Sequence, residues 1–485
     1  MDATHPPRRS PVICALIPLG LLAVGAASPL PSLAADTPDG LLMASGTAGV
    51  RIYDPARDVV VFDFITDGVM ARQGGCSAGT CFPLAAHHVI HKGVDFIDVG
   101  IVRYGVLNPD PRMWWPSVIT RVKVDAAPVE IWTVRELDFR DVPERDSYCR
   151  QGDDEPWANP RNPGCFLSFV HGFQVLEDAP EENRVTLVTT DPWNNRILGL
   201  TLDYSGGNTA AHVDWVLGSQ NPDWPLSAWP NHVQQVDGDD GERYLVSTFV
   251  AAEDTPWSAA PLIMWREDAV RGEWVQMWRH PDPDSGEMPF LQGSHMGEVL
   301  RDPQTGRQVI WYNHGRGLAS GWNNDFNTDL GGTFGLLIPG ATLGDTPSYA
   351  FDAELFSDDP TRGVNYARDV DFLEDGTLLL TDGACQSGGC PEEGGVYRVA
   401  RFHDGARPSD RSGAFSADHS TQTLQPVPSS MVLEDYHCDF PWLFEAEWIP
   451  RRSMGRNLVT LGRRASQACY PEVDPPEGAR FILPF

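Results

Sequence analysis

The feature that most constrains this chain is an internal repeat of short, strand-like segments. Each unit holds up to four runs rich in β-branched and aromatic residues, separated by Gly, Pro, Asn and Asp, a pattern typical of antiparallel strands. The runs that begin the units are 171–176, 232–237, 295–300, 368–373 and 444–449. Successive units start 61 to 76 residues apart, and four strands per repeat indicate the blades of a β-propeller.

A four-stranded sheet cannot bury both of its faces alone, so such units must stack around a common axis. Residues 165–485 supply five units, and residues 36–164 supply one further blade with long loops. Its strand-like runs are 50–53, 59–64, 96–104 and 130–137. The fifth unit has runs at 444–449, 457–461 and 479–483 but no clear fourth strand, so an N-terminal strand is expected to close the ring.

We therefore predict that residues 36–485 form one all-β domain, a β-propeller with four-stranded antiparallel blades. Six blades are expected, and seven are the alternative. A β-sandwich, or a row of small β domains, is the competing interpretation of the same strand pattern.

Charge and the N-terminal segment limit the partners and the location. The chain has 67 acidic and 36 basic residues and a net charge of −31, which disfavours nucleic acid and anionic membrane surfaces. Arg8 and Arg9 precede an apolar run and then small residues ending at Ala35, the pattern of a cleaved signal peptide over 1–35. No later stretch is long enough to span a bilayer. We expect a secreted or periplasmic protein.

Eight cysteines follow the predicted signal peptide and fall into four pairs of neighbours along the chain. An even number of cysteines in an exported protein favours disulfides over thiol chemistry. The expected pairs are Cys76–Cys81, Cys149–Cys165, Cys385–Cys390 and Cys438–Cys469.

The first residues of the five units predict a functional site. They are His171, His232, His295, Arg368 and Phe444. Because the first strand of each blade lines the channel of a propeller, these side chains are expected to form a ring. Loops after the second strands would reach the same mouth, and they carry Asp191, Asn194, Asn195, Arg196, His314, Arg316 and Asp382. Guanidinium and imidazole groups together suit sulfate, phosphate or carboxylate.

The same residues have two other interpretations. A histidine facing the channel can bridge blades by hydrogen bonds alone. Three imidazoles on one axis can also hold copper, iron or zinc, with His87, His88 and His91 as further ligands. Arg368 would repel a cation in that ring, so we expect no metal and no other cofactor.

Two segments carry a family resemblance. One is Trp229-Pro-Asn-His232-Val-Gln-Gln-Val-Asp followed by Tyr244-Leu-Val-Ser-Thr, and the other runs from His295-Met-Gly-Glu-Val-Leu to Asn313-His-Gly-Arg316. Over about residues 165–483 the chain resembles bacterial aryl-sulfate sulfotransferases. The resemblance implies an exported six-bladed propeller that moves a sulfuryl group between phenols through a histidine adduct.

The resemblance also implies roles for individual residues. His232 and His295 would hold the sulfuryl oxygens, and Arg316 would neutralise their charge. The nucleophilic histidine of the family is expected where this chain has Arg368, and arginine cannot act as that nucleophile because it stays protonated. Either His171 or His314 takes that role, or the protein binds anions without transferring them.

Two functional hypotheses follow. The first is a sulfotransferase-like enzyme, and the second is a non-catalytic binding or scaffold propeller. In both, the expected ligand is small and anionic or aromatic. Tryptophans in loops either stack on such a ligand or cover the packing between blades: Trp114, Trp115, Trp193, Trp224 and Trp229.

Overall fold

In a computed structural model the chain divides into two compact units, Met1–Thr37 and Pro38–Phe485. The structure describes residues 39–46, 49–57, 59–63, 81–103, 115–125, 128–142, 165–206, 209–225, 228–251, 261–280, 296–314, 333–355, 367–382, 395–399, 409, 425–427 and 443–460. All of them belong to the second unit, so the predicted signal peptide lies outside them. Within these ranges there is no helix with the length and hydrophobicity of a membrane span.

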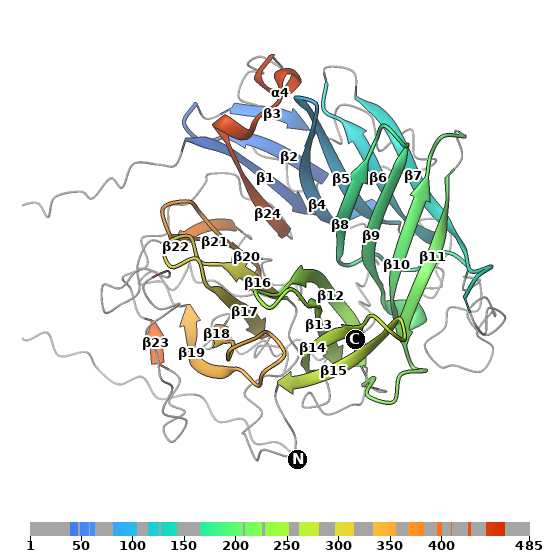
Figure 1. Cartoon of the computed structure of the whole chain (residues 1–485). Helices are drawn as coiled ribbons and strands as arrows, with labels where there is room; N and C mark the ends of the chain where they lie inside the picture. The colour runs from blue at the N-terminus through green and yellow to red at the C-terminus, as the bar shows by residue number, and fades with distance from the viewer. Residues whose placement is uncertain are drawn as a thin grey trace, which may run out of the picture. The chain divides into compact units, whose positions relative to one another are not determined.

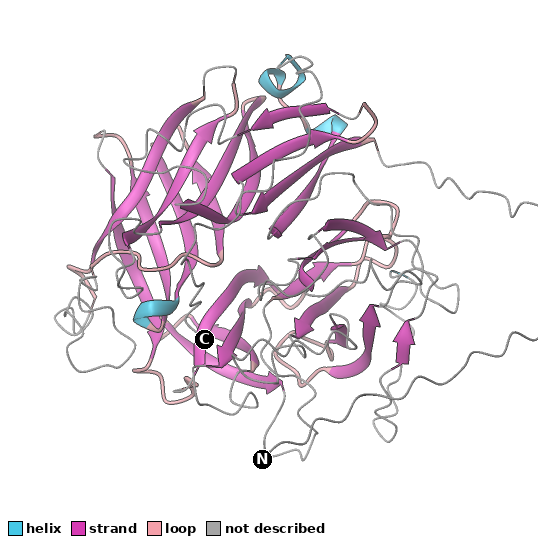
Figure 2. Ribbon diagram, turned by 180° about the vertical axis from the view of Figure 1, so that it is seen from behind, coloured by secondary structure: helices cyan, strands magenta, loops and turns pink. Residues whose placement is uncertain are grey.

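The described residues form an all-β β-propeller with antiparallel sheets, and helices are few and short (Figures 1 and 2). The first sheet contains β24 (Leu443–Pro450), β1 (Gly40–Gly46), β2 (Gly49–Asp54) and β3 (Val59–Asp63). The second contains β4 (Cys81–His91), β5 (Val94–Arg103), β6 (Trp115–Lys123), β7 (Val129–Asp138), β11 (Thr209–Gly218), β10 (Arg196–Asp203), β9 (Arg184–Asp191) and β8 (Phe173–Ala179).

Three further sheets complete the described fold. The third sheet contains β12 (Ala228–Asp237), β13 (Arg243–Ala251), β14 (Leu262–Asp268) and β15 (Glu273–His280). The fourth contains β16 (Gly297–Arg301), β17 (Gln308–His314), β18 (Thr333–Ile338), β19 (Ser348–Leu355) and β23 (Gln425–Val427). The fifth contains β20 (Ala367–Phe372), β21 (Leu378–Asp382) and β22 (Gly395–Val399).

The described strands thus form five hydrogen-bonded sheets, where six or seven blades were expected. The difference arises at one contact. β7 pairs in parallel with β11, through Thr209 with Val134 and His212 with Asp138, and this pairing joins β4–β7 and β8–β11 into one eight-stranded sheet.

The first and the last of the described strands meet in the first sheet. β24 pairs antiparallel with β1, from Gly40 opposite Pro450 to Gly46 opposite Leu443. The N-terminal region therefore completes the sheet that contains β24, as expected, but it contributes three strands, β1 to β3, instead of one. The strand expected over 457–461 is wrong, because α4 (Arg456–Thr460) lies there. The predicted run 479–483 lies outside the described residues.

Helix α4 forms because buried polar groups of β5 satisfy its first turn. The Asp95 carboxylate accepts hydrogen bonds from the backbone N–H groups of Gly455 (2.6 Å) and Leu458 (2.9 Å). The Asn457 side chain accepts from the Asp95 N–H (2.7 Å) and donates to its carbonyl (2.9 Å). A helix of five residues is marginal alone, so these tertiary contacts decide its structure.

We expect Asn457→Ala to lower the free energy of unfolding by about 2 kcal/mol, because it removes the side-chain acceptor of the buried Asp95 N–H and a donor to the Asp95 carbonyl. Val459→Ala on the same helix is the control, since Val459 is 64% exposed and should change stability by less than about 0.5 kcal/mol. Urea denaturation of both variants measures the difference. Equal stability of the two variants would contradict this account of α4.

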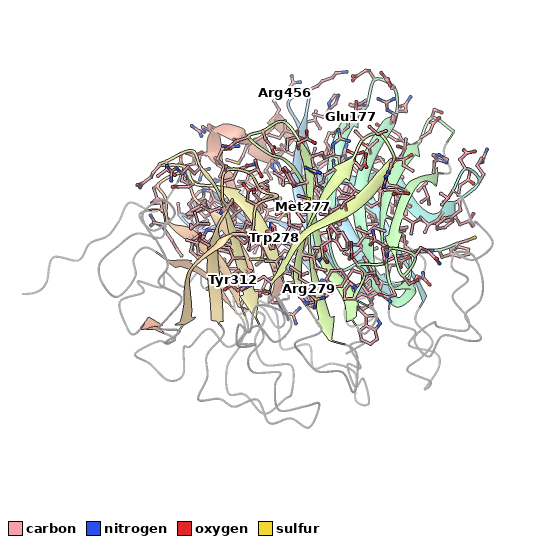
Figure 3. The ribbon with its side chains drawn as sticks, turned by 60° about the horizontal axis from the view of Figure 1, so that its bottom comes forward. Glu177, Met277, Trp278, Arg279, Tyr312 and Arg456 are labelled. Carbon is pink, nitrogen blue, oxygen red and sulfur yellow. The ribbon has the colours of Figure 1, made fainter. Side chains whose placement is uncertain are left out.

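The core lies between neighbouring sheets, as it must when sheets stack face to face. Trp278 of β15 and Tyr312 of β17 belong to one buried cluster, with Met277 packed against it (Figure 3). The Trp278 indole N–H donates to the Leu343 carbonyl (2.8 Å). Of the tryptophans considered as ligand platforms, Trp224 and Trp229 are buried and contribute to packing.

The described residues test little of the disulfide prediction. Cys165 is disulfide-bonded, and Cys81 is described only as the first residue of β4. None of the four expected pairs has both cysteines described, so the pairing stays a prediction. The remaining cysteines lie outside the described residues: Cys76, Cys149, Cys385, Cys390, Cys438 and Cys469.

Candidate functional site

A cavity of about 290 Å³ lies where six edge strands of the five sheets meet. Its volume is at the lower end for small-molecule sites, so it suits a small ligand. Side chains from six strands line it: β4, β8, β12, β16, β20 and β24. In Figure 1 these strands lie on the inner side of the sheets, around a common centre. The polar lining residues are His87, Gln174, His232, Gln234, Glu298, Asp369, Asp371, Glu445 and Glu447.

Alternation along the strands explains this lining. Side chains two residues apart in a strand lie on the same face of its sheet. Three of the edge strands therefore each present two polar groups to the cavity, in the pairs His232 and Gln234, Asp369 and Asp371, and Glu445 and Glu447. The result is five carboxyl groups and no lysine or arginine among the described lining residues.

Most of these polar side chains bridge one edge strand to the next. From β4, His87 Nε2 contacts the Phe173 carbonyl (2.8 Å). From β8, Gln174 accepts from the Gln235 N–H (2.7 Å), and from β12, Gln234 accepts from the Val299 N–H (2.8 Å). These contacts join edge strands that do not pair with each other by backbone hydrogen bonds. We call each such contact a polar bridge.

Three of the five carboxylates form polar bridges in the same way. Each accepts a backbone N–H of a neighbouring strand: Asp369 from Ala446 (3.0 Å), Glu445 from Ala86 (3.0 Å) and Glu447 from His88 (2.7 Å). A carboxylate oxygen committed to a buried N–H is part of the structure, because losing it would leave that donor unpaired.

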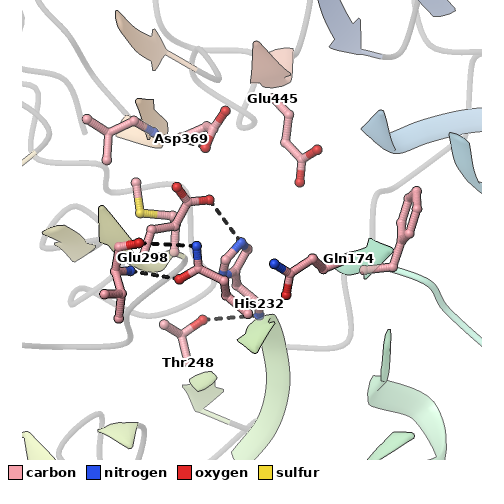
Figure 4. Close-up of polar contacts among 12 residues, drawn as sticks. Gln174, His232, Thr248, Glu298, Asp369 and Glu445 are labelled. Carbon is pink, nitrogen blue, oxygen red and sulfur yellow. Dashed lines mark hydrogen bonds and ion pairs between the residues drawn. The ribbon is translucent and has the colours of Figure 1, made fainter. Parts of the chain in front are cut away.

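Glu298 differs from these three carboxylates. In the described part of the chain no polar bridge joins β16 to β20, and the Glu298 carboxylate instead contacts His232 of β12, with Oε1 3.3 Å from Nε2 (Figure 4). The side chain of Glu298 is 19% exposed, so it reaches the cavity. It is therefore a carboxyl group available for chemistry.

Burial keeps both members of this pair neutral near pH 7. Desolvation raises the pKa of Glu298 to about 8 because a buried carboxylate loses its hydration. Desolvation lowers the pKa of His232 to about 4, against smaller opposing effects of the Asp369 charge and of a hydrogen bond to the backbone of Gly297. A protonated carboxyl thus lies beside an uncharged imidazole.

Asp371 supplies a second available carboxyl group on the neighbouring strand. Burial raises its pKa to about 7, and the Glu298 charge raises it further. The pKa values of Asp369 and Glu445 are also raised, chiefly by burial, and that of Glu447 is raised to about 8. The pKa of Asp371, about 7, lies below the pKa of Glu298, about 8, so Asp371 ionises while Glu298 stays protonated.

The structure brings some of the sequence-predicted residues together. The Arg368 guanidinium lies 4.4 Å from the centre of the Phe444 ring, and the His171 ring is 6.4 Å from the same ring. Burial lowers the pKa of His171 well below its usual value, and the charge of Arg368 lowers it further. His171 and Arg368 are buried, and only His232 of the expected ring is among the residues that line the cavity.

Three other predicted site residues are not placed by side chain. His295 and Arg316 lie outside the described residues, and His314 is described only as the last residue of β17. Their predicted roles stay predictions. The polar groups of the described lining are carboxyl, amide and imidazole groups. The anion site expected from the sequence finds no support in them, because they include no lysine or arginine to pair with sulfate or phosphate.

The polar residues after β9 form a structural network. Asp191 accepts hydrogen bonds from the Ser168 N–H (2.9 Å), the Asn194 amide (2.9 Å) and the Arg196 Nε–H (2.8 Å). Arg196 also lies 4.9 Å from the centre of the Phe139 ring. Because Arg196 is buried and paired with Asp191, its guanidinium serves packing and not anion binding.

The histidines considered as metal ligands are separated by the strand geometry. His87 Nε2 contacts the Phe173 carbonyl, while His88 Nε2 contacts the Asp95 carboxylate (2.9 Å). Adjacent residues of a strand point to opposite faces, so these two imidazoles cannot share an ion. Within the described residues there is no group of three His, Cys, Asp or Glu side chains arranged to hold a metal.

Comparison with known proteins finds only weak structural similarity. No family model matches the sequence, and no curated protein matches it significantly. Among solved structures, the periplasmic gluconolactonase of Pseudomonas aeruginosa is 12% identical, with a TM-score of 0.40, over 84% of this chain and 99% of that one. The resemblance to aryl-sulfate sulfotransferases finds no support in these comparisons.

Two further similar structures illustrate the spread of activities. The alpha-L-arabinofuranosidase of Fusarium graminearum is 12% identical, with a TM-score of 0.37, over 67% of this chain and 79% of that one. A hypothetical selenium-binding protein from Sulfolobus tokodaii is 10% identical, with a TM-score of 0.39, over 90% of this chain and 97% of that one. Similarity at this level carries no argument about function.

Proposed function

We propose that the cavity is the active site of a hydrolase that cleaves a glycosidic bond, with Glu298 as general acid and Asp371 as the ionised partner. The observation that supports this most is the division among the carboxyl groups. Three of them form polar bridges, whereas Glu298 and Asp371 make no such bridge among the described residues. A pair of carboxyl groups in opposite protonation states is what glycoside hydrolysis needs.

The reaction uses these groups in order. The Glu298 carboxyl donates its proton to the glycosidic oxygen as the bond between that oxygen and the anomeric carbon breaks. The Asp371 carboxylate stabilises the positive charge that develops on the sugar, and it either takes a proton from the attacking water or bonds to the anomeric carbon first. The attacking water leaves its oxygen and one proton as the new hydroxyl group of the sugar. Its other proton returns to Glu298, directly where Asp371 is the nucleophile, or by way of Asp371 and solvent where Asp371 is the base.

The lining also favours a neutral or cationic sugar over an anionic one. The described lining residues offer carboxyl and amide groups for hydroxyl groups of a ligand, and no lysine or arginine to pair with a sulfate or phosphate. For this reason we place glycoside hydrolysis ahead of sulfuryl transfer. A binding propeller without catalysis would not need two carboxyl groups that form no polar bridge.

Two other expectations remain proposals. We propose that β4–β7 and β8–β11 are two blades joined at their outer strands, which gives six blades, one for each strand that lines the cavity. We also propose that the protein is exported, on the basis of the charged and apolar pattern of residues 1–35.

The pH dependence of hydrolysis tests the assignment of roles. Activity requires Asp371 ionised and Glu298 protonated, and their pKa values are about 7 and about 8. The rate should rise as the pH passes 7, reach a maximum between pH 7 and 8, and fall as Glu298 ionises above pH 8. The measurement is kcat/KM from pH 5 to 10; a flat profile would contradict the paired roles.

A substrate panel tests the reaction class. Neutral 4-nitrophenyl glycosides, including furanosides and pyranosides, are compared with 4-nitrophenyl sulfate at pH 7.5. We expect turnover of at least one glycoside and none of the sulfate ester. Turnover of the sulfate ester with a phenol acceptor present, and of no glycoside, would favour sulfuryl transfer instead.

A further inference from the structure

We infer that His232 is a positioning residue, which donates Nε2–H to Oε1 of Glu298 and leaves Oε2 to carry the proton given to the leaving group. This inference rests on the proposed role of Glu298 as general acid. The contact between Nε2 and Oε1 is 3.3 Å, and it crosses from β12 to β16 (Figure 4). His232 thus holds in place a carboxyl group that no polar bridge holds.

The backbone of His232 is itself fixed. Its N–H donates to the Thr248 hydroxyl (3.1 Å), the residue opposite it on β13. Gly172 lies against the same point, since a Cβ there would be 3.2 Å from the His232 Cα. The His232 imidazole lies on a constrained backbone segment and can orient the Glu298 carboxyl group, because little rotamer freedom remains to be lost.

The surroundings of the ring favour a proton on Nε2. Nδ1 is buried and has no hydrogen-bond partner among the described residues. A buried lone pair without a partner costs less than a buried N–H without one, so the neutral ring keeps its proton on Nε2. A hydrogen-bond donor at Nε2 suits Glu298 both before and after proton transfer. It donates first to the carbonyl oxygen of the protonated carboxyl group and then to the carboxylate.

Other titratable groups face Glu298 from every strand packed around it. His232 lies on β12, Asp369 and Asp371 on β20, and Glu445 on β24, and the Glu298 charge influences the last three. Those three are carboxyl groups, which raise the pKa of Glu298 when ionised. Among these four described residues, His232 alone can donate a hydrogen bond that stabilises the ionised form of Glu298.

The test replaces His232 by Phe, which keeps the ring volume and removes the donor, and by Gln, which keeps an N–H at a similar reach. The pKa of the Glu298 carboxyl is measured by NMR titration of protein labelled at the glutamate carboxyl carbon, with the signal assigned from Glu298→Gln. This readout needs no substrate, so it stands even if no glycoside is hydrolysed.

We expect His232→Phe to raise the pKa of Glu298 by about one unit, because loss of a hydrogen bond to the charged form disfavours ionisation. His232→Gln should restore a value near that of the native protein. If hydrolysis occurs, kcat should fall about tenfold in His232→Phe with KM little changed, and the alkaline limb should move to higher pH. An unchanged or lowered pKa in His232→Phe would overturn the inference, whatever the activity.

Discussion

Glu298→Gln should lower kcat for a neutral glycoside at pH 7.5 by about 10²- to 10⁴-fold, the usual contribution of a general acid. The amide has the size of the carboxyl group but cannot give up a proton to the glycosidic oxygen. KM should change little, because the same atoms remain to contact the sugar. The loss should be smallest for 4-nitrophenyl glycosides, whose leaving group needs little protonation, and largest for alkyl glycosides.

Glu447→Gln is the matched control in the same cavity. The Glu447 carboxylate accepts the His88 N–H at 2.7 Å, and a glutamine oxygen can accept the same hydrogen bond. Activity should therefore stay within a few-fold of that of the native protein. Equal losses in both variants, or full activity in Glu298→Gln, would contradict the choice of Glu298 as the acid.

The repeat pattern was sufficient to predict the strands because period-two alternation and turn residues are local properties. The predicted run 232–237 lies within β12, and 444–449 lies within β24. The number of sheets was not predictable in the same way. The pairing of Thr209 with Val134 depends on how two distant segments meet, which no local pattern records.

In two strands, the residues that the sequence analysis assigned to the site are one position away from the residues that line the cavity. The sequence alignment put Arg368 and Phe444 in the channel with His232, whereas Asp369 and Glu445 line the cavity in the structure. A shift of one residue moves a side chain to the opposite face of a strand. Hence the expected cationic ring is an acidic one.

A usable signal for the acidic lining was present in the chain. The pairs Asp369 with Asp371 and Glu445 with Glu447 place two acidic groups on one face of an apolar strand, which is costly unless that face meets a cavity or a partner. The polar bridges that separate structural carboxylates from Glu298 could not be inferred, because each joins two strands of different sheets and depends on their register.

Arg121→Met is expected to have the largest effect on stability, a loss of about 3–5 kcal/mol of unfolding free energy. Arg121 of β6 is 2% exposed, and its guanidinium donates to both oxygens of Asp98 on β5 (2.6 and 2.7 Å) and to Asp178 on β8 (2.7 Å). The ion pairs thus connect β4–β7 to β8–β11 across the eight-stranded sheet. Without the guanidinium, the carboxyl group of Asp98 is buried without a counter-charge.

Two variants separate this effect from loss of a surface charge. Arg140→Met removes an ion pair with Asp138 in which the arginine side chain is 69% exposed, so it should cost less than about 1 kcal/mol. Asp98→Asn combined with Arg121→Met should recover part of the loss, because the fully buried Asp98 charge is removed together with its partner, while Asp178 is 18% exposed to solvent. The stabilities of the variants are compared by their urea denaturation midpoints, with the m-value required to be the same in each.

The loss in Arg121→Met should also depend on pH in a defined direction. Burial already raises the pKa of Asp98 against the opposing effect of Arg121, and removing the guanidinium raises it further. A carboxyl group whose pKa is raised in the folded state stabilises the fold below its unfolded value and loses this contribution as the pH rises. The unfolding free energy of the variant should therefore be closer to that of the native protein at pH 5 than at pH 8. An equal loss of unfolding free energy at both pH values would show that packing of the arginine stem, and not its charge, joins the two halves of the sheet.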